Sequence, residues 1–235
     1  MKTRLALLAL ASVVPMAANA NLVINGDFES GNTGFTSSHI LVIGTGTALF
    51  PAPPAVPASG DGGVGNENMY NEGTYTVTNA EPGAWHALWR NDLDLTNHDR
   101  YFLVNGATQA GVGVWSQVIP GLVDGQLYRL SFDVANALSA GTAAAQLSLS
   151  LGNSIVLNVN APAGNQQWIN VFGDFIFDGS GGSSANILNA IVAEQGNDFA
   201  IDNISLEPVP EPFTVGLGAL GLAAFMRKRA KKAKA

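Results

Sequence analysis

The chain has 235 residues, of which 11 are Lys or Arg and 18 are Asp or Glu, for a formal net charge of −7. Between residues 21 and 208 only Arg90, Arg100 and Arg129 are basic against 17 acids, so this part has a net charge of −14. Nucleic-acid binding needs clustered Lys and Arg to replace the counterions on the phosphates, and this composition excludes it. The chain has no Cys, which excludes disulfides, thiolate nucleophiles and cysteine-based metal sites.

Residues 1–20 have the pattern of a secretory signal peptide. Lys2 and Arg4 precede the apolar run Leu5–Val14, and Ala18-Asn19-Ala20 supplies a small-x-small cleavage site. Ten apolar residues are too few to cross a bilayer. We therefore expect export, with cleavage at the end of this segment.

Residues 21–208 are predicted to form one all-β domain, because their hydrophobic period is two. In Tyr128–Val134 the even-numbered residues are apolar and the odd-numbered ones are polar. Leu147–Leu151 and Ile155–Val159 alternate in the same way around the turn Gly152-Asn153-Ser154, which predicts a β-hairpin. Short strands with Gly-rich turns between them predict an antiparallel β-sandwich or jelly roll.

Two later segments and one long loop complete the prediction for this domain. One strand is expected to place its apolar residues on one face and its polar residues with a Trp on the other: Ile169, Val171, Phe175 and Phe177 against Trp168, Asn170 and Asp174. Near the end of the domain the apolar phase moves by one residue between Ile201 and Ile204, which predicts a β-bulge. The Pro- and Gly-rich segment Phe50–Gly65 is predicted to be a surface loop.

Residues 209–235 have the pattern of a marginal membrane anchor. An uncharged, mostly apolar stretch, Phe213–Met226, is followed by basic residues to the end of the chain. Its 14 residues would span only about 21 Å as a helix, less than the roughly 30 Å of a bilayer core. The basic end would hold this transmembrane segment with its C-terminus on the cytoplasmic side. Such a weak anchor suits a temporary role.

The order of these C-terminal elements resembles the PEP-CTERM sorting signal of Gram-negative bacteria. The matching residues are Val209, Pro210, Glu211 and Pro212 before the apolar stretch, and Arg227, Lys228 and Arg229 after it. One departure is the Lys-rich extension beyond Arg229. The resemblance implies processing by an exosortase, a membrane protease-transferase, and delivery to the cell surface or an exopolysaccharide matrix. The alternative is a plain C-terminal membrane anchor.

A second resemblance covers most of residues 21–208. Asn21–Glu29 and Asp198–Leu206 look like the first and last strands of galactose-binding-like jelly rolls, the fold of many carbohydrate-binding modules. In that fold these strands lie together and often hold a structural calcium. The resemblance implies Glu29 and Asp202 as ligands with Asp27 as a weaker third, while carbonyl and water oxygens complete the shell. The alternative is that they are solvated turn acids.

Glycan binding is the function that this resemblance implies, and aromatic residues are the candidates for it. Sugar rings stack on aromatic faces, and Trp85, Trp89 and Arg90 lie together between predicted strands. Trp168 shares a strand face with polar residues and is expected to be the most exposed Trp. Core packing is the alternative for each Trp.

Catalysis has little support in the sequence. The three His residues are isolated, and no HExxH or GxSxG motif occurs. We therefore expect an exported, non-catalytic protein that binds polysaccharide or another surface glycan. The alternatives are a structural matrix protein whose Trp residues are all buried, and an extracellular hydrolase with two acids of raised pKa in a cleft.

Overall fold

The computed structural model describes residues 20–44, 68–138, 144–163, 167–190 and 197–210. Residues 1–19 of the predicted signal peptide, the segment Phe50–Gly65 and the tail from Glu211 onwards lie outside these residues. Those three predictions remain predictions.

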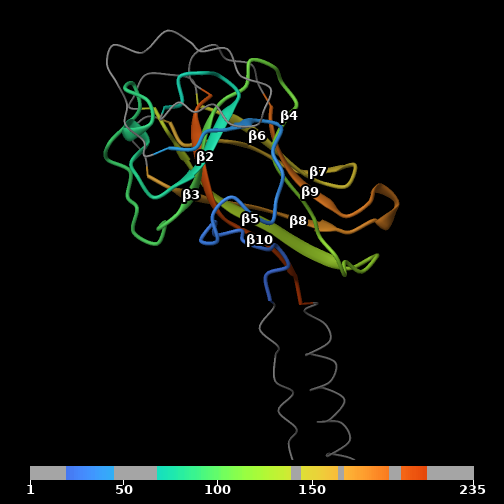
Figure 1. Ribbon diagram of the computed structural model, residues 1–235. Coiled ribbons are helices and arrows are strands. Elements are labelled where there is room, and N and C mark those ends of the chain that lie inside the picture. The colour runs from blue at the N-terminus through green and yellow to red at the C-terminus, as the bar shows by residue number, and fades with distance from the viewer. Residues whose placement is uncertain (1–19, 45–67, 139–143, 164–166, 191–196, 211–235) are drawn as a thin grey trace, which may run out of the picture.

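The described residues form ten strands in two sheets, which confirms the predicted all-β sandwich (Figure 1). The six-stranded sheet has the order β1 (Ile40–Leu41), β2 (Thr74–Thr78), β3 (Tyr101–Asn105), β10 (Phe199–Pro208), β5 (Leu127–Asn136) and β8 (Ile169–Ile176). The four-stranded sheet has the order β4 (Val112–Val118), β9 (Ser184–Asn189), β6 (Gln146–Leu151) and β7 (Ser154–Asn160). The strand pairs are antiparallel except for β1 and β2. Two short 3-10 helices, η1 (Pro82–Ala84) and η2 (Gly179–Gly181), lie in the connections.

The local strand predictions are confirmed. β6 and β7 form the expected hairpin, in which Leu147 pairs with Val159. Its turn contains Gly152 at a φ of 55°, a conformation that glycine adopts without steric cost. Along β8, Val171 and Phe175 pack against the core between the sheets and the residues of the other parity are exposed, but Ile169, predicted for the core face, is 37% exposed.

Two hydrophobic cores hold the sandwich together. The main core lies between the sheets and draws large side chains from both: Phe28, Phe102, Trp115, Phe132, Leu147, Ile187 and Phe199. A second core lies on the outer face of the six-stranded sheet, where Met69, Trp85, Trp89 and Leu93 cover Tyr101 and Leu103 of β3. All five residues of β3 are buried for this reason, because the strand faces one core on each side.

The predicted bulge in β10 is confirmed. Its register against β5 shifts between Asp202 and Ser205, and Asn203 has a φ of 51°. The predicted opening strand at residues 21–29 is wrong, because left-handed backbone at Asn25 and Phe28 turns this segment instead.

This N-terminal segment nevertheless lies against the last strand, as the jelly-roll resemblance implied. Leu22 N donates to Leu206 O at 2.9 Å, and Ile204 N donates to Gly26 O at 2.8 Å. A Cβ at Gly26 would lie 2.0 Å from Ile204 O, so only glycine fits this approach. In Figure 1 the first described residues (blue) and the end of β10 (orange-red) leave the sandwich side by side.

Candidate functional site

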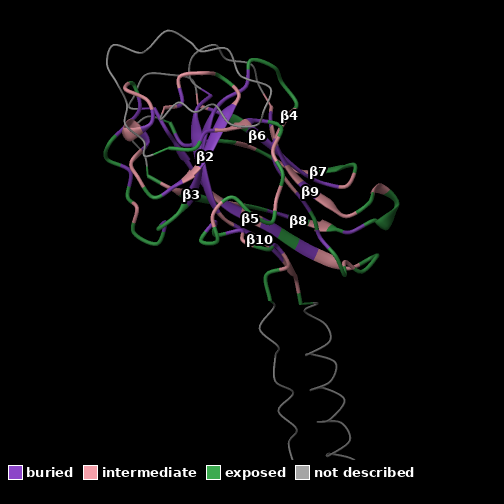
Figure 2. Ribbon diagram, viewed as in Figure 1, coloured by how far each residue is buried: buried purple, intermediate pink, exposed green. Residues whose placement is uncertain are grey.

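The second core covers only part of the outer face of the six-stranded sheet. The remaining part, over β10, β5 and β8, carries polar side chains and one aromatic side chain that point away from the main core. We call it the open face, and its residues are Arg129, Asp133, Asn170, Phe172, Asp174, Asn203, Ser205 and Glu207. Figure 2 shows buried and less buried residues alternating along β5, as expected for a strand with one core-facing side.

A row of hydrogen bonds runs across the three strands of the open face. Asp133 on β5 accepts from Asn170 Nδ2 on β8 at 2.8 Å and from Asn203 Nδ2 on β10 at 2.9 Å. Each amide retains a second N–H and a carbonyl oxygen for other partners. The bulge brings Asn203 to this row, so the irregularity in β10 has a direct effect on the site.

An aromatic side chain with a fixed guanidinium lies beside this row. Arg129 binds the carboxylate of Asp174 through two hydrogen bonds of 2.7 and 2.8 Å, and its guanidinium carbon lies 4.3 Å from the centre of the Phe172 ring. These hydrogen bonds hold the pKa of Asp174 below its usual value. Phe172 is 51% exposed. The exposed ion pair contributes little to stability but fixes the geometry of both groups.

A buried Asp–His pair forms the border between the open face and the second core. His98 Nδ1 lies 2.8 Å from Asp202 Oδ2, and the His98 ring stacks on Trp168 with ring centres 4.1 Å apart. Asn203 N donates to Asp202 Oδ1 at 2.7 Å. Burial raises the pKa of Asp202 to about 6, although the hydrogen bonds from His98 and Asn203 lower it in part. The pair therefore holds the His98 ring against Trp168.

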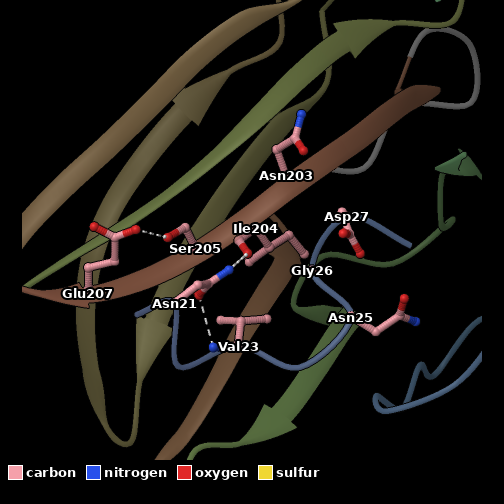
Figure 3. Close-up of a pocket in the computed structure, with 9 residues that line it drawn as sticks. All are labelled: Asn21, Val23, Asn25, Gly26, Asp27, Asn203, Ile204, Ser205 and Glu207. Carbon is pink, nitrogen blue, oxygen red and sulfur yellow. Dashed lines mark hydrogen bonds between the residues drawn. The ribbon is translucent and has the colours of Figure 1, made fainter. Parts of the chain in front are cut away.

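A polar cleft of about 440 Å³ lies next to the open face, between the N-terminal segment and β10. Figure 3 shows side chains of β10 on one side and those of the N-terminal segment on the other. Its lining residues are Asn21, Val23, Asn25, Gly26, Asp27, Asn203, Ile204, Ser205 and Glu207. The lining offers amides, a hydroxyl and two carboxylates but no aromatic ring. Asn203, Ser205 and Glu207 belong to both the cleft and the open face, so the two form one continuous polar surface.

The predicted glycan-binding residues Trp85, Trp89 and Arg90 are buried, so their prediction as a binding surface is wrong. Both Trp side chains are 3% exposed and belong to the second core, where Trp85 Nε1 donates to Thr78 Oγ1 at 3.0 Å. Arg90 is 2% exposed, and its Nε donates to Asp92 Oδ1 at 2.7 Å. The outer face of β3 is covered by apolar area, and the two Trp side chains supply part of it.

Trp168 is more accessible, in part as expected. It is half-buried, and its Nε1 donates to Asp94 O at 2.9 Å. One face of the indole is covered by His98. Its edge is approached by Tyr101.

The predicted calcium ligands are not gathered into a ligand set. Glu29 and Asp27 are exposed, and Glu29 Oε1 accepts from Arg100 N at 2.9 Å. Both oxygens of the buried Asp202 accept hydrogen bonds. Within the described ranges, no three His, Asp or Glu side chains form a group that could hold a metal ion. Calcium at Glu29 and Asp202 would need backbone and water oxygens and stays a prediction.

Phe172 is the site residue that sequence reasoning missed. Its position number has the same parity as Trp168, Asn170 and Asp174, so strand alternation places it on the polar face. An aromatic residue at a position that alternation assigns to the polar face could have identified Phe172 as a candidate binding residue.

The C-terminal sorting motif is described only at its start. Val209 N donates to Leu127 O at 2.9 Å and so extends the pairing of β10, and Pro210 is exposed. The rest of the motif lies outside the described residues. Among the residues that the structure places, no helix is long and apolar enough to cross a membrane.

Comparisons with known proteins find similarity only at the level of three-dimensional structure. No protein-family model matches the chain, and no curated protein matches it. The CBM22-1 xylan-binding domain of Xyn10C from Paenibacillus barcinonensis superposes with a TM-score of 0.41 and 11% identity, over 58% of this chain and 81% of that domain. A family 16 carbohydrate-binding module superposes with a TM-score of 0.40 and 16% identity, over 79% of this chain and 99% of that module.

Enzymes occur among these structures too. The Stig cyclase Fisc from Fischerella sp. TAU superposes with a TM-score of 0.42 and 15% identity, over 58% of this chain and 75% of the cyclase. At such identities the function has to be argued from the residues of the site.

Proposed function

We propose that this protein is an exported, non-catalytic glycan-binding module that uses the open face and its neighbouring cleft. The observation that carries the proposal is the exposed Phe172 ring beside the hydrogen-bonded row formed by Asn170, Asp133 and Asn203. This combination differs from an ordinary solvated sheet face, where polar side chains are not held in place.

The chemistry of the open face suits a sugar chain. A pyranose ring presents C–H groups that pack on the Phe172 ring, and its hydroxyls need both donors and acceptors. The amides of Asn170 and Asn203 supply both kinds of group, while Asp133 fixes their orientation. The acidic character of the domain favours a neutral or cationic glycan over a polyanionic one.

A glycan array followed by titration of the best ligand tests this proposal. Phe172→Ala should weaken binding about tenfold, because an aromatic contact of this kind is worth about 1–1.5 kcal/mol. Ile155→Ala is the matched control, since Ile155 is a 66% exposed apolar residue on β7 of the other sheet. Equal affinities of the two variants would refute the assignment of the face.

We further propose that the C-terminal segment is a sorting signal for an exosortase, with transient membrane anchoring and delivery to the cell surface or extracellular matrix. The order of Pro210-Glu211-Pro212, the apolar stretch and the basic end supports this. Mass spectrometry of the released protein should find the basic end missing. Intact Lys234 in that protein would contradict the proposal.

A structural matrix protein without a glycan site is the second candidate. The burial of Trp85, Trp89 and Trp115 favours it, because these rings offer no stacking surface. An array on which the wild-type protein binds nothing would support this candidate. A hydrolase that uses Asp202 has less support, since this acid is 1% exposed.

A further inference from the structure

Two acids and an amide lie at the end of the six-stranded sheet where β10 begins. Because Phe199 pairs with Val104, Asp198 and Asn105 are the next cross-strand neighbours, and Gly106 N donates to Asp198 Oδ1 at 3.1 Å. On the other side of β3, Asn105 pairs with Thr74 of β2.

Glu72 reaches this end of the sheet through the turn that precedes β2. Gly73 N donates to Asn105 O at 3.1 Å and to Gly106 O at 2.9 Å, so Glu72 adjoins the same strand end. We call Glu72, Asn105 and Asp198 the end cluster. Asn105 lies between the two acids in the order of the strands.

The Asn105 side chain lacks a partner on its oxygen. Asn105 is 3% exposed, and its Nδ2 donates to Met69 O at 2.6 Å. Its Oδ1 has no hydrogen-bond partner. A buried carbonyl oxygen without a donor is costly, by about 1–3 kcal/mol, and such an atom needs an explanation.

Ionisation of the two acids in the end cluster is disfavoured. Burial raises the pKa of Asp198, although Gly106 N and Trp89 Nε1 donate hydrogen bonds to its carboxylate. Burial and the neighbouring Asp198 raise the pKa of Glu72 to about 7. Within the described part of the chain, the ion pairs found involve neither acid. A positive charge at this place would stabilise the ionised forms of both acids and give Asn105 Oδ1 a partner.

We propose that the end cluster binds a divalent cation of the calcium class through the oxygens of Glu72, Asn105 and Asp198. Calcium accepts carboxylate and amide oxygens together and fills its remaining positions with carbonyl oxygens and water. This site differs from the one implied at Glu29 and Asp202, because Asp202 lies four residues further along, at the bulge of β10. It is independent of the glycan proposal, because it shares no residue with the open face.

Terbium luminescence on the purified full-length chain tests the proposal. Tb³⁺ is a probe for calcium sites that emits when a nearby Trp is excited, and Trp89 Nε1 lies 3.0 Å from Asp198 Oδ2. The wild-type protein should give saturable emission that added Ca²⁺ displaces. Glu72→Gln should weaken Tb³⁺ binding at least tenfold. Glu72 is the most solvent-accessible of the three residues, so this variant should fold normally, and circular dichroism checks that it does.

Glu29→Gln is the matched control, because it removes an exposed carboxylate from the other calcium prediction. It should leave emission at the end cluster unchanged. Three results would overturn the proposal: no saturable emission from the wild type, wild-type affinity in Glu72→Gln, or loss of binding in Glu29→Gln alone. The last result would place the cation at Glu29 instead.

Discussion

Asp202→Asn should change how the stability of the domain depends on pH. Asp202 is 1% exposed, and burial raises its pKa from 3.8 to about 6. Since the folded state holds this proton more tightly than the unfolded state, protonation favours folding. That stabilisation is complete below about pH 4 and is lost as the pH rises through about 6. A shift of about two units at about 1.4 kcal/mol each corresponds to about 3 kcal/mol.

Urea unfolding of the wild-type protein and of Asp202→Asn between pH 4 and pH 7.5, in EDTA, measures this effect. The free energy of unfolding of the wild type, taken relative to the variant, should fall by about 3 kcal/mol over this range. Glu72 and Asp198 also have raised pKa values, but they titrate in both proteins and cancel in the difference.

A difference that stays constant with pH would refute the reasoning. If the free energy of unfolding of the wild type instead rises relative to that of the variant as the pH rises, the pair with His98 stabilises the ionised carboxylate. Repeating the series in millimolar calcium also tests the predicted site at Glu29 and Asp202. A cation bound there would stabilise the ionised Asp202, so the free energy of unfolding of the wild type relative to the variant would no longer fall towards pH 7.5.

Three further substitutions test the packing. Gly26→Ala should cost at least about 2 kcal/mol in denaturant unfolding, because its Cβ would lie 2.0 Å from a backbone oxygen. Its control is Gly179→Ala, whose Cβ would meet no atom closer than 3.8 Å and which should change stability by less than about 0.5 kcal/mol. Trp85→Phe should cost about 1 kcal/mol in the same assay, because it removes one of the two hydrogen bonds that the buried Thr78 hydroxyl accepts; a neutral result would contradict the second core. Phe172→Ala should change the thermal midpoint little, and a large drop would mean that the ring serves packing rather than binding.

Local pattern predicted the strands well because alternation needs no knowledge of distant residues. The β6–β7 hairpin, the faces of β8 and the bulge of β10 all follow from the period of two. The second core could not be predicted in this way. All five residues of β3 are buried, so the strand shows no alternation. The residues that cover its outer side, from Met69 to Leu93, are known only from their contacts in the folded domain.

The site was predicted less well for a physical reason. A Trp has a large apolar surface and one polar N–H, so Trp85 and Trp89 suit a core and a binding face equally well in sequence. The open face depends on register between strands, since Asn170, Asp133 and Asn203 are separated by 37 and 70 residues. Alternation shows which face a side chain takes but not which side chain of another strand lies opposite.

The contact between the N-terminal segment and β10 has a consequence for how the domain folds. Asn21 exchanges hydrogen bonds with Ile204 and Leu206, across 183 and 185 residues. β10 also lies between β3 and β5 in the sheet, so each neighbour lacks one of its two partner strands until the end of the domain has been synthesised. Such long sequence separations slow folding. The six-stranded sheet should therefore be completed only when residue 206 becomes available, a delay that would suit the export proposed above.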